Sequence, residues 1–268
     1  MPDAAKLALL INFKENIHMK LKFVIMAMAA FLGVGSLSNL AAAPSTLSGG
    51  AVFLPDNRTR NSLTTVHPAY RIGRLENGCT GALVGYNFGT VKHVLTAAHC
   101  VYDPVTKNFR TGLNFVPQQN GLVKPLGTIK PVKVYVPKAW SMKGDRSADY
   151  ALLLLPKDLY PKANAFGLWS GQFPRGTTGL LAYPSDKPLG TVWASPCSYQ
   201  LYQAKYYRYK CDAAKGSDGA PFWSMEILGQ IATISAIHLG GPEAGYNIGL
   251  WITPTIYQQL SNWILEAK

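Results

Sequence analysis

Two residues of this chain, a histidine and, further along, an aspartate, lie in sequence settings that suit proton transfer. His99 ends an apolar, β-rich run, and the next residue is Cys100, which could tie the loop to Cys79. An imidazole held in this way is a candidate general base. Asp149 opens the apolar run Ala151–Leu155, where a carboxylate is costly to bury unless it meets a hydrogen-bond donor, and we expect His99 to be that donor. Such an aspartate would hold the imidazole in the tautomer that accepts a proton.

Asp145 and Asp158 compete with Asp149 for this role. Both lie in more polar, turn-like surroundings, whereas Asp149 stands at the start of a strand-like run. A lone histidine is more often structural than catalytic, but the cysteine directly after His99 favours the functional interpretation.

Short β-rich runs separated by turns must position these groups. The runs predicted to be strands are Gly81–Tyr86, Val91–Thr96, Lys130–Val136, Ala151–Leu155, Thr178–Ala182, Gln230–Ile237 and Tyr246–Ile252. Near the end of the chain, Thr253 can cap a helix that has Pro254 at its first position. Four apolar residues of that helix then share one face: Ile256, Leu260, Trp263 and Ile264. The sequence therefore predicts an all-β fold with a C-terminal helix.

The first 43 residues have the composition of a secretory signal rather than of folded protein. Two lysines precede the apolar run 23–37, and three consecutive alanines predict cleavage after Ala43. We therefore predict that the protein is secreted or periplasmic, with the signal starting naturally at Met19. An uncleaved membrane anchor is the alternative, although the apolar run is short for a span of about 20 residues. After signal removal we expect no stable membrane insertion.

The rest of the chain divides into a leader and one folded domain. Residues 44–55 are small and apolar with Ser and Gly, as in a leader or propeptide. Residues 56–268 are long enough to bury the core of a two-barrel domain. The proline-bounded segment 156–161 follows a predicted strand and is the expected crossover between the barrels.

The four cysteines are an even number in an exported chain, which favours disulfides over metal ligation. They permit three pairings, and we expect the two local ones, Cys79 with Cys100 and Cys197 with Cys211. The second would close a loop of about 15 residues and stabilise the fold by roughly 3 kcal/mol in the chain-entropy model. The spacing of a structural zinc site does not occur, so we expect no metal and no cofactor.

The charge of the chain bears on its partners. The full sequence has 26 basic and 14 acidic residues, and removal of residues 1–43 leaves a net charge of +10. Because the basic residues are dispersed and no block of five or more occurs, we interpret the charge as a solvated surface and not as a nucleic-acid site. We expect a monomer whose partner is a peptide or protein with acidic residues.

Several motifs together resemble the bacterial glutamyl endopeptidases of the trypsin-like superfamily, from about residue 56 to the C-terminus. A histidine, an aspartate and a Gly-x-x-Gly-x-Pro turn follow in the order of chymotrypsin-like serine proteases. The matching stretches are Asp56–Arg60, Thr96–Cys100, Asp149–Ala151, Tyr183–Pro188 and Ile237–Gly241. The resemblance implies two six-stranded antiparallel β-barrels with the site between them.

The resemblance also implies roles within that site. Residues Tyr209–Pro221 are similar to the family's nucleophile loop without a gap, which puts Asp218 in the position of the nucleophilic serine and Gly216 at the oxyanion hole. Ser217 is the alternative nucleophile, although a one-residue slip of the loop would displace the oxyanion donors. His238 matches the histidine that helps to bind the substrate's glutamate carboxylate in the family. A core histidine is the other interpretation of His238.

An aspartate at position 218 is poorly suited to peptide hydrolysis. The triad needs a hydroxyl whose proton passes to the imidazole during attack, and a carboxylate offers none. Two flanking carboxylates would also favour a protonated His99, which cannot act as a base. We therefore expect an exported serine-protease homologue that is inactive or severely impaired and acts by binding acidic peptides. The alternatives are an active endopeptidase that cleaves after Glu or Asp through Ser217, and a structural or decoy protein that does not use its cleft.

Overall fold

The structure is a computed structural model that describes residues 50–85, 88–159, 165–173, 178–224, 232–243 and 245–267. The predicted signal region 1–43, with the natural start expected at Met19, and residues 44–49 of the predicted leader lie outside the described residues. All elements below belong to the unit formed by residues 46–268. In the ranges that are described, no helix has both the length and the apolar character needed to cross a bilayer.

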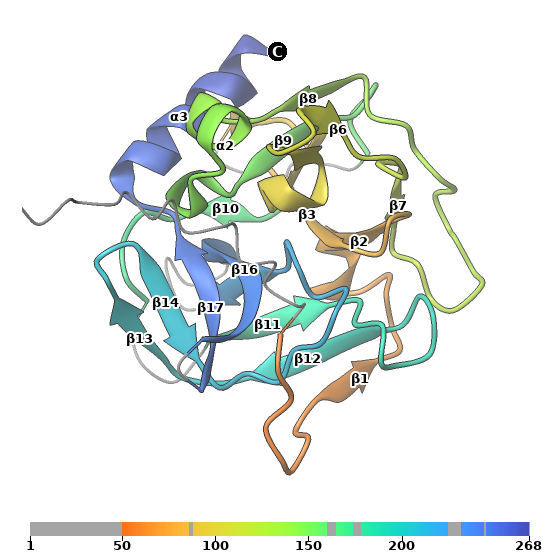
Figure 1. Cartoon of the computed structure of the whole chain (residues 1–268). Coiled ribbons are helices and arrows are strands. Elements are labelled where there is room, and N and C mark those ends of the chain that lie inside the picture. Colours follow the sequence, from red (N-terminus) through yellow and green to blue (C-terminus); the bar gives the residue numbers. More distant parts are fainter. Residues whose placement is uncertain are drawn as a thin grey trace, which may run out of the picture. The chain divides into compact units, whose positions relative to one another are not determined.

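One antiparallel sheet is formed by six strands from the first part of the chain, in the order β7–β2–β3–β4–β9–β8 (Figure 1). Their bounds are Ile72–Leu75 (β2), Thr80–Val84 (β3), His93–Thr96 (β4), Phe115–Pro117 (β7), Lys133–Tyr135 (β8) and Ala151–Leu154 (β9). A separate hairpin joins β5 (Tyr102–Asp103) to β6 (Asn108–Phe109). Every residue of β3 and β4 is buried, because the sheet curls and both of its faces are covered.

The second sheet contains nine strands in the described part of the chain, in the order β1–β12–β11–β15–β16–β17–β14–β13, with β10 paired to β16. Their bounds are Thr59–Asn61 (β1), Gly167–Leu168 (β10), Thr178–Ala182 (β11), Val192–Pro196 (β12), Tyr199–Tyr202 (β13), Tyr206–Tyr209 (β14), Pro221–Ser224 (β15), Thr233–Glu243 (β16) and Tyr246–Trp251 (β17). The predicted all-β fold with two curled antiparallel sheets is confirmed. The second sheet is larger than the six strands implied by the resemblance, since β1 and β13 extend its edges and β10 pairs in parallel with β16.

Each of the seven predicted strand runs contains an observed strand, with ends that differ by a few residues. The strands that were not predicted are mostly two to four residues long, too short to give a clear alternation of apolar and polar residues. β9 ends at Leu154 and β10 begins at Gly167, so the chain passes from one sheet to the other between them. The predicted crossover 156–161 falls in this interval, and residues 160–164 are not described.

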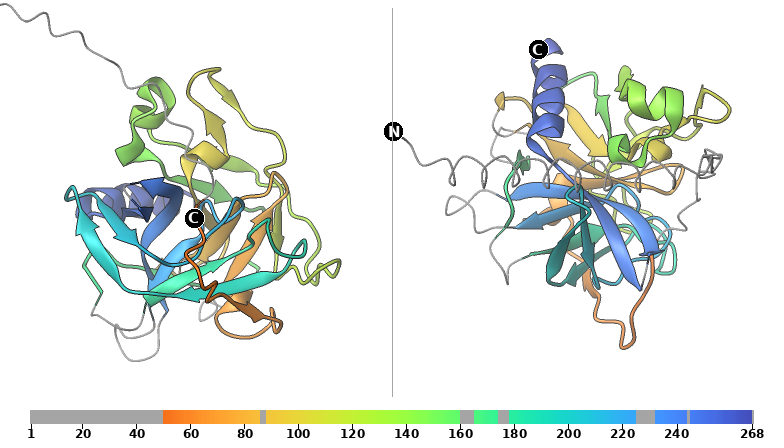
Figure 2. Two further views of the ribbon diagram at one scale, coloured as in Figure 1. Left: turned by 60° about the horizontal axis from the view of Figure 1, so that its bottom comes forward. Right: turned by 60° about the vertical axis from the view of Figure 1, so that its left-hand side comes forward.

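The predicted C-terminal helix is confirmed as α3, Pro254–Glu266. The Thr253 hydroxyl accepts the Ile256 backbone N–H at 3.4 Å, and three of the four predicted apolar positions are buried. The fourth, Trp263, is half-buried and stacks on Tyr135 with a centroid distance of 5.5 Å. A further short helix, α2 (Lys138–Lys143), was not predicted, and Figure 2 shows α2 and α3 at the same end of this unit.

The described part of the predicted leader, residues 50–55, is held against the second sheet rather than loose. Ala51 and the Asn247 side chain exchange two hydrogen bonds, of 2.7 and 2.8 Å. The buried Asp212 carboxylate accepts the backbone N–H groups of Phe53 at 2.6 Å and Asn57 at 2.8 Å. These contacts attach the segment before β1 to β17 and to the segment between β14 and the glycine-rich loop.

Candidate active site

His99 is carried by the 3₁₀ turn η4 (Ala98–Cys100), which follows β4 directly. The Cys79–Cys100 disulfide joins this turn to the start of β3, with a Cα–Cα distance of 6.2 Å. The predicted pairing is confirmed here and at Cys197–Cys211, where the Cα atoms lie 5.1 Å apart. The His99 side chain is 27% exposed, so the imidazole is fixed near its backbone and still reachable from solvent.

The Asp149 carboxylate holds His99 through two hydrogen bonds. One oxygen accepts the His99 backbone N–H at 2.8 Å, and the other pairs with the imidazole Nδ1 at 2.8 Å. Asp149 is buried and follows the 3₁₀ turn η5 (Arg146–Ala148). The competing acids bind elsewhere: Asp145 accepts the Ser147 backbone N–H, and Asp158 accepts the Thr90 hydroxyl. The structure thus brings Asp149, and neither competitor, to the imidazole.

The glycine-rich loop 216–221 presents Asp218 to the other side of the same imidazole. Asp218 Oδ1 lies 3.8 Å from His99 Nε2, and the residue is only 8% exposed. This carboxylate oxygen has no hydrogen-bond partner within the described residues. His99 therefore stands between two carboxylates, one hydrogen-bonded to it and one facing it at a longer distance.

The backbone of this loop depends on two glycines in the left-handed region. Gly216 has φ of +94° and Gly219 has φ of +82°, values that favour glycine. A Cβ at position 219 would lie 2.1 Å from the Thr96 hydroxyl and 2.4 Å from the Thr80 carbonyl oxygen. The loop can approach β3 and β4 this closely because glycine has no side chain.

Thr80 of β3 ties the loop to the first sheet. Its hydroxyl donates to the Gly216 carbonyl at 2.8 Å and accepts the Tyr183 backbone N–H at 3.0 Å. Its backbone N–H donates to the Asp218 carbonyl at 2.9 Å. A single buried threonine thus sets the distance between the loop of the second sheet and the strands that carry His99.

Ser217, the alternative nucleophile, is buried in its own turn. Its Oγ accepts the Ala214 backbone N–H at 3.3 Å, and its backbone N–H donates to the Ala214 carbonyl at 2.9 Å. No hydrogen bond between Ser217 and His99 occurs among the described residues, whereas the Asp218 carboxylate faces the imidazole.

The two carboxylates control the protonation of His99. Burial alone would lower the pKa of His99, but the charge and hydrogen bond of Asp149, together with the charge of Asp218, raise it to about 9. Burial raises the pKa of Asp218, while the charge of His99 and the backbone N–H groups of Gly216 and Asp218 act in the opposite direction. At neutral pH the imidazole is therefore in its charged form, with no free nitrogen to accept a proton.

His238 lies on β16 directly behind the loop. Its carbonyl accepts the Gly219 backbone N–H at 2.8 Å, and its Nδ1 hydrogen-bonds to the Tyr209 hydroxyl at 2.8 Å. The ring is fully buried, and in the described part of the chain its Nε2 has no partner. Burial first, and the charge of His99 second, lower the pKa of His238 to about 3, so the ring is neutral.

Three residues of this site were not predicted as such. Thr80 and Tyr209 act through contacts with residues far away in sequence, and Trp140 of α2 places its ring 6.5 Å from that of His99. No local pattern marks them, although Tyr209 opens the stretch that resembles the nucleophile loop. Cys79, His99 and Cys100 offer ligand atoms within 4.8 Å of one another, but both sulfurs belong to the disulfide and supply no thiolate to a metal.

Two curled antiparallel sheets that bring a His–Asp pair against a glycine-rich loop define a chymotrypsin-like serine protease fold. The family model described as Trypsin matches residues 56–226, which is more than half of the chain. The chain belongs to the trypsin family.

Known relatives agree with this assignment. The chain is 28% identical over 258 residues to the glutamyl endopeptidase of Bacillus licheniformis. This match covers 89% of this chain and 79% of that protein. It is 28% identical over 225 residues to serine protease 23 of Bos taurus, covering 71% of this chain and 58% of the length of that relative. A solved glutamyl endopeptidase structure, in complex with MPD, superposes with a TM-score of 0.70 at 21% identity, covering 80% of this chain and 100% of that one, and shows the shared fold.

Proposed function

We propose that this chain is an exported homologue of the glutamyl endopeptidases that binds peptides with acidic residues and hydrolyses them slowly or not at all. The observation that carries this proposal is the carboxylate that faces His99 Nε2 at 3.8 Å. In a working triad this nitrogen takes a proton from a hydroxyl as the oxygen attacks the carbonyl carbon. An aspartate there has no hydroxyl, and attack by its carboxylate would give an acid anhydride instead of an ester.

The charge state of His99 supports the same conclusion. The general base must be neutral before it can take a proton, and a pKa of about 9 keeps most of the imidazole protonated at pH 7. Asp149 and Asp218 thereby stabilise a form of the site that suits binding and not proton abstraction.

His238 supports an acidic ligand. Its ring is neutral, and when the Tyr209 hydroxyl donates to Nδ1, the tautomer that results carries a proton on Nε2. That N–H has no acceptor in the described structure and is suited to a carboxylate oxygen. The similarity to a protein named glutamyl endopeptidase agrees with this preference.

Two peptides that differ only by Glu or Gln at one position test the binding part of the proposal. We expect the purified protein to bind the Glu peptide about tenfold more tightly by calorimetry, and His238→Gln to remove that difference. Tyr209→Phe is the matched variant, because it removes the hydrogen bond that sets the tautomer and keeps the ring. Equal affinity for the two peptides would contradict an acidic ligand, and unchanged interactions in His238→Gln would favour a protein that does not use its cleft.

A fluorogenic glutamyl substrate tests the catalytic part. We expect no turnover above background in the unaltered protein. Turnover that disappears in Ser217→Ala would instead establish the active endopeptidase, although the contact between Ser217 and Ala214 disfavours this outcome. Export rests on the two disulfides, which persist in oxidising compartments outside the cytoplasm.

A further inference from the structure

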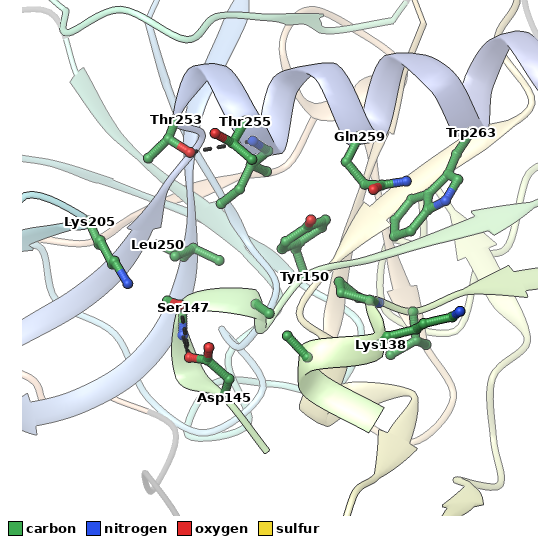
Figure 3. Close-up of a pocket in the computed structure, with 15 residues that line it drawn as sticks. Lys138, Asp145, Ser147, Tyr150, Lys205, Leu250, Thr253, Thr255, Gln259 and Trp263 are labelled. Carbon is green, nitrogen blue, oxygen red and sulfur yellow. Dashed lines mark hydrogen bonds between the residues drawn. The ribbon is translucent and has the colours of Figure 1, made fainter. Parts of the chain in front are cut away.

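A cavity of about 670 Å³ lies beside α2, η5 and the first turns of α3 (Figure 3). Its volume is in the range of small-molecule sites. The lining residues include Tyr150, Trp263, Lys138 and Lys205, and they do not include His99, Asp149, Asp218 or His238. The cavity is therefore separate from the candidate active site.

Tyr150 supplies a hydrogen-bond donor to this cavity. The residue is only 6% exposed, and its hydroxyl makes no hydrogen bond with any described residue. Figure 3 shows its ring in the middle of the cavity, with the hydroxyl directed towards α3 between Thr255 and Gln259. The hydroxyl oxygen is not one of the fully buried polar atoms that lack a partner, so it is open to the cavity and can donate a hydrogen bond to a ligand there. Burial raises the pKa of Tyr150 to about 12, which keeps the phenol protonated and able to donate.

The charge around the cavity favours an anion. Lys138 and Lys205 both line it, and neither forms an ion pair within the ranges that the structure describes. The acidic lining residue, Asp145, accepts the Ser147 backbone N–H and hydroxyl through one carboxylate oxygen at 2.8 Å each and keeps its negative charge, so the two lysines leave the lining with a net positive charge. The N-terminus of α3 adds the positive end of a helix dipole at the same cavity.

Apolar and aromatic side chains line the cavity next to the two lysines. The rings of Trp263 and Tyr150 are 5.8 Å apart at 39°, and Leu250, Val136 and Ile256 also line the cavity. Aromatic side chains of this kind pack well against a flat ring. The cavity therefore combines an aromatic surface with a positive rim and one phenol donor.

The geometry points to a second binding site in this cavity for a small aromatic carboxylate, with the ring against Trp263 and the carboxylate near Lys205, the α3 N-terminus and the Tyr150 hydroxyl. This site does not depend on the function proposed above. It is nevertheless close to the active site in sequence, since Ala148 and Tyr150 line it and Asp149 between them holds His99.

Calorimetry with 2-naphthoate as the probe tests the inference on the purified protein. We expect a dissociation constant below about 1 mM, and about tenfold weaker binding of the neutral 2-naphthamide. Lys205→Met and Tyr150→Phe should each weaken 2-naphthoate binding about fivefold, whereas Lys124→Met, which removes an exposed lysine that does not line the cavity, should leave it unchanged.

Gln259→Trp provides a test that does not depend on charge. The larger side chain fills the cavity from α3, and we expect it to abolish 2-naphthoate binding while the thermal unfolding midpoint stays close to that of the unaltered protein. No binding to the unaltered protein at about 5 mM probe would overturn the inference. Binding that survives Gln259→Trp, or that is equal for 2-naphthoate and 2-naphthamide, would overturn it as well.

Discussion

The two nitrogens of the His99 ring differ sharply in how closely a carboxylate contacts them. On the Nδ1 side, Asp149 makes two hydrogen bonds of 2.8 Å to the same residue, as an orienting carboxylate should. On the Nε2 side, Asp218 lies at 3.8 Å with one oxygen unpaired among the described residues. The side that orients the imidazole is thus tightly bonded, whereas the other side presents a carboxylate at a longer distance.

The backbone beneath Asp218 is nevertheless tied to the first sheet. Gly216 and Gly219 adopt the left-handed conformations of a tight loop, and Thr80 bonds to this loop at two points. The comparison teaches that the positioning of a reactive group and its chemistry are separable, because backbone hydrogen bonds set the first and a single side chain sets the second.

Asp218→Ser should have the largest effect, since it replaces the carboxylate that faces His99 Nε2 and leaves Asp149 unchanged. We expect hydrolysis of a fluorogenic glutamyl peptide to rise about 10³-fold or more above that of the unaltered protein, because a hydroxyl then faces the imidazole. Asp218→Ala is the matched control and should give no gain. Absence of turnover in Asp218→Ser would mean that the loop no longer offers a working nucleophile position.

Gly219→Ala should cause the next largest effect by disturbing the loop backbone. The added methyl group would meet the Thr96 hydroxyl at 2.1 Å and the Thr80 carbonyl at 2.4 Å, so we expect a loss of about 3–5 kcal/mol in urea unfolding. Gly121→Ala is the control, because its φ is also positive but no atom lies within 4 Å of the new Cβ. The control should lose only about 1 kcal/mol, and equal losses would show that the contact with the first sheet is unimportant.

The pKa of His99 reports how strongly Asp149 and Asp218 each stabilise the charged imidazole. NMR titration should give a value of about 9, and Asp149→Asn should lower this pKa more than Asp218→Asn, since the charge and hydrogen bond of Asp149 contribute most to raising it. Because the folded pKa lies above the ordinary value of 6.5, the associated stability is fully present below pH 6.5 and is lost as the pH rises through 9. We expect this contribution to reach up to about 3 kcal/mol. A larger effect of Asp218→Asn would reverse the comparison.

Thr80→Val should have the smallest effect of the four. It keeps the shape of the side chain but removes the hydrogen bonds to Gly216 and Tyr183, so we expect a loss of about 1–2 kcal/mol in urea unfolding. Thr106→Val, at an exposed position, is the control and should change stability little. A loss no greater than that of the control would show that other contacts hold the loop against the first sheet.

Much of the fold could be predicted because its signals are local. Thr253 and Pro254 mark the start of α3 by their own side-chain chemistry, and long apolar runs such as Ala151–Leu154 mark strands. The local pairing Cys197–Cys211 also follows from a short loop. The three added strands of the second sheet were missed, since pairs such as β1 with β12 join residues more than 130 positions apart.

The sequence by itself determined which groups this site contains: an imidazole, two carboxylates and a glycine-rich turn without a hydroxyl at position 218. Only the tertiary structure decided how these groups meet. Asp149 and Asp218 lie on opposite sides of His99 because one is carried by the first sheet and the other by a loop of the second, and Thr80 joins that loop to the first sheet across 136 residues. The cavity around Tyr150 has the same origin, because the residues of α3 that line it are far in sequence from those of α2 and η5 and meet them only in the folded chain.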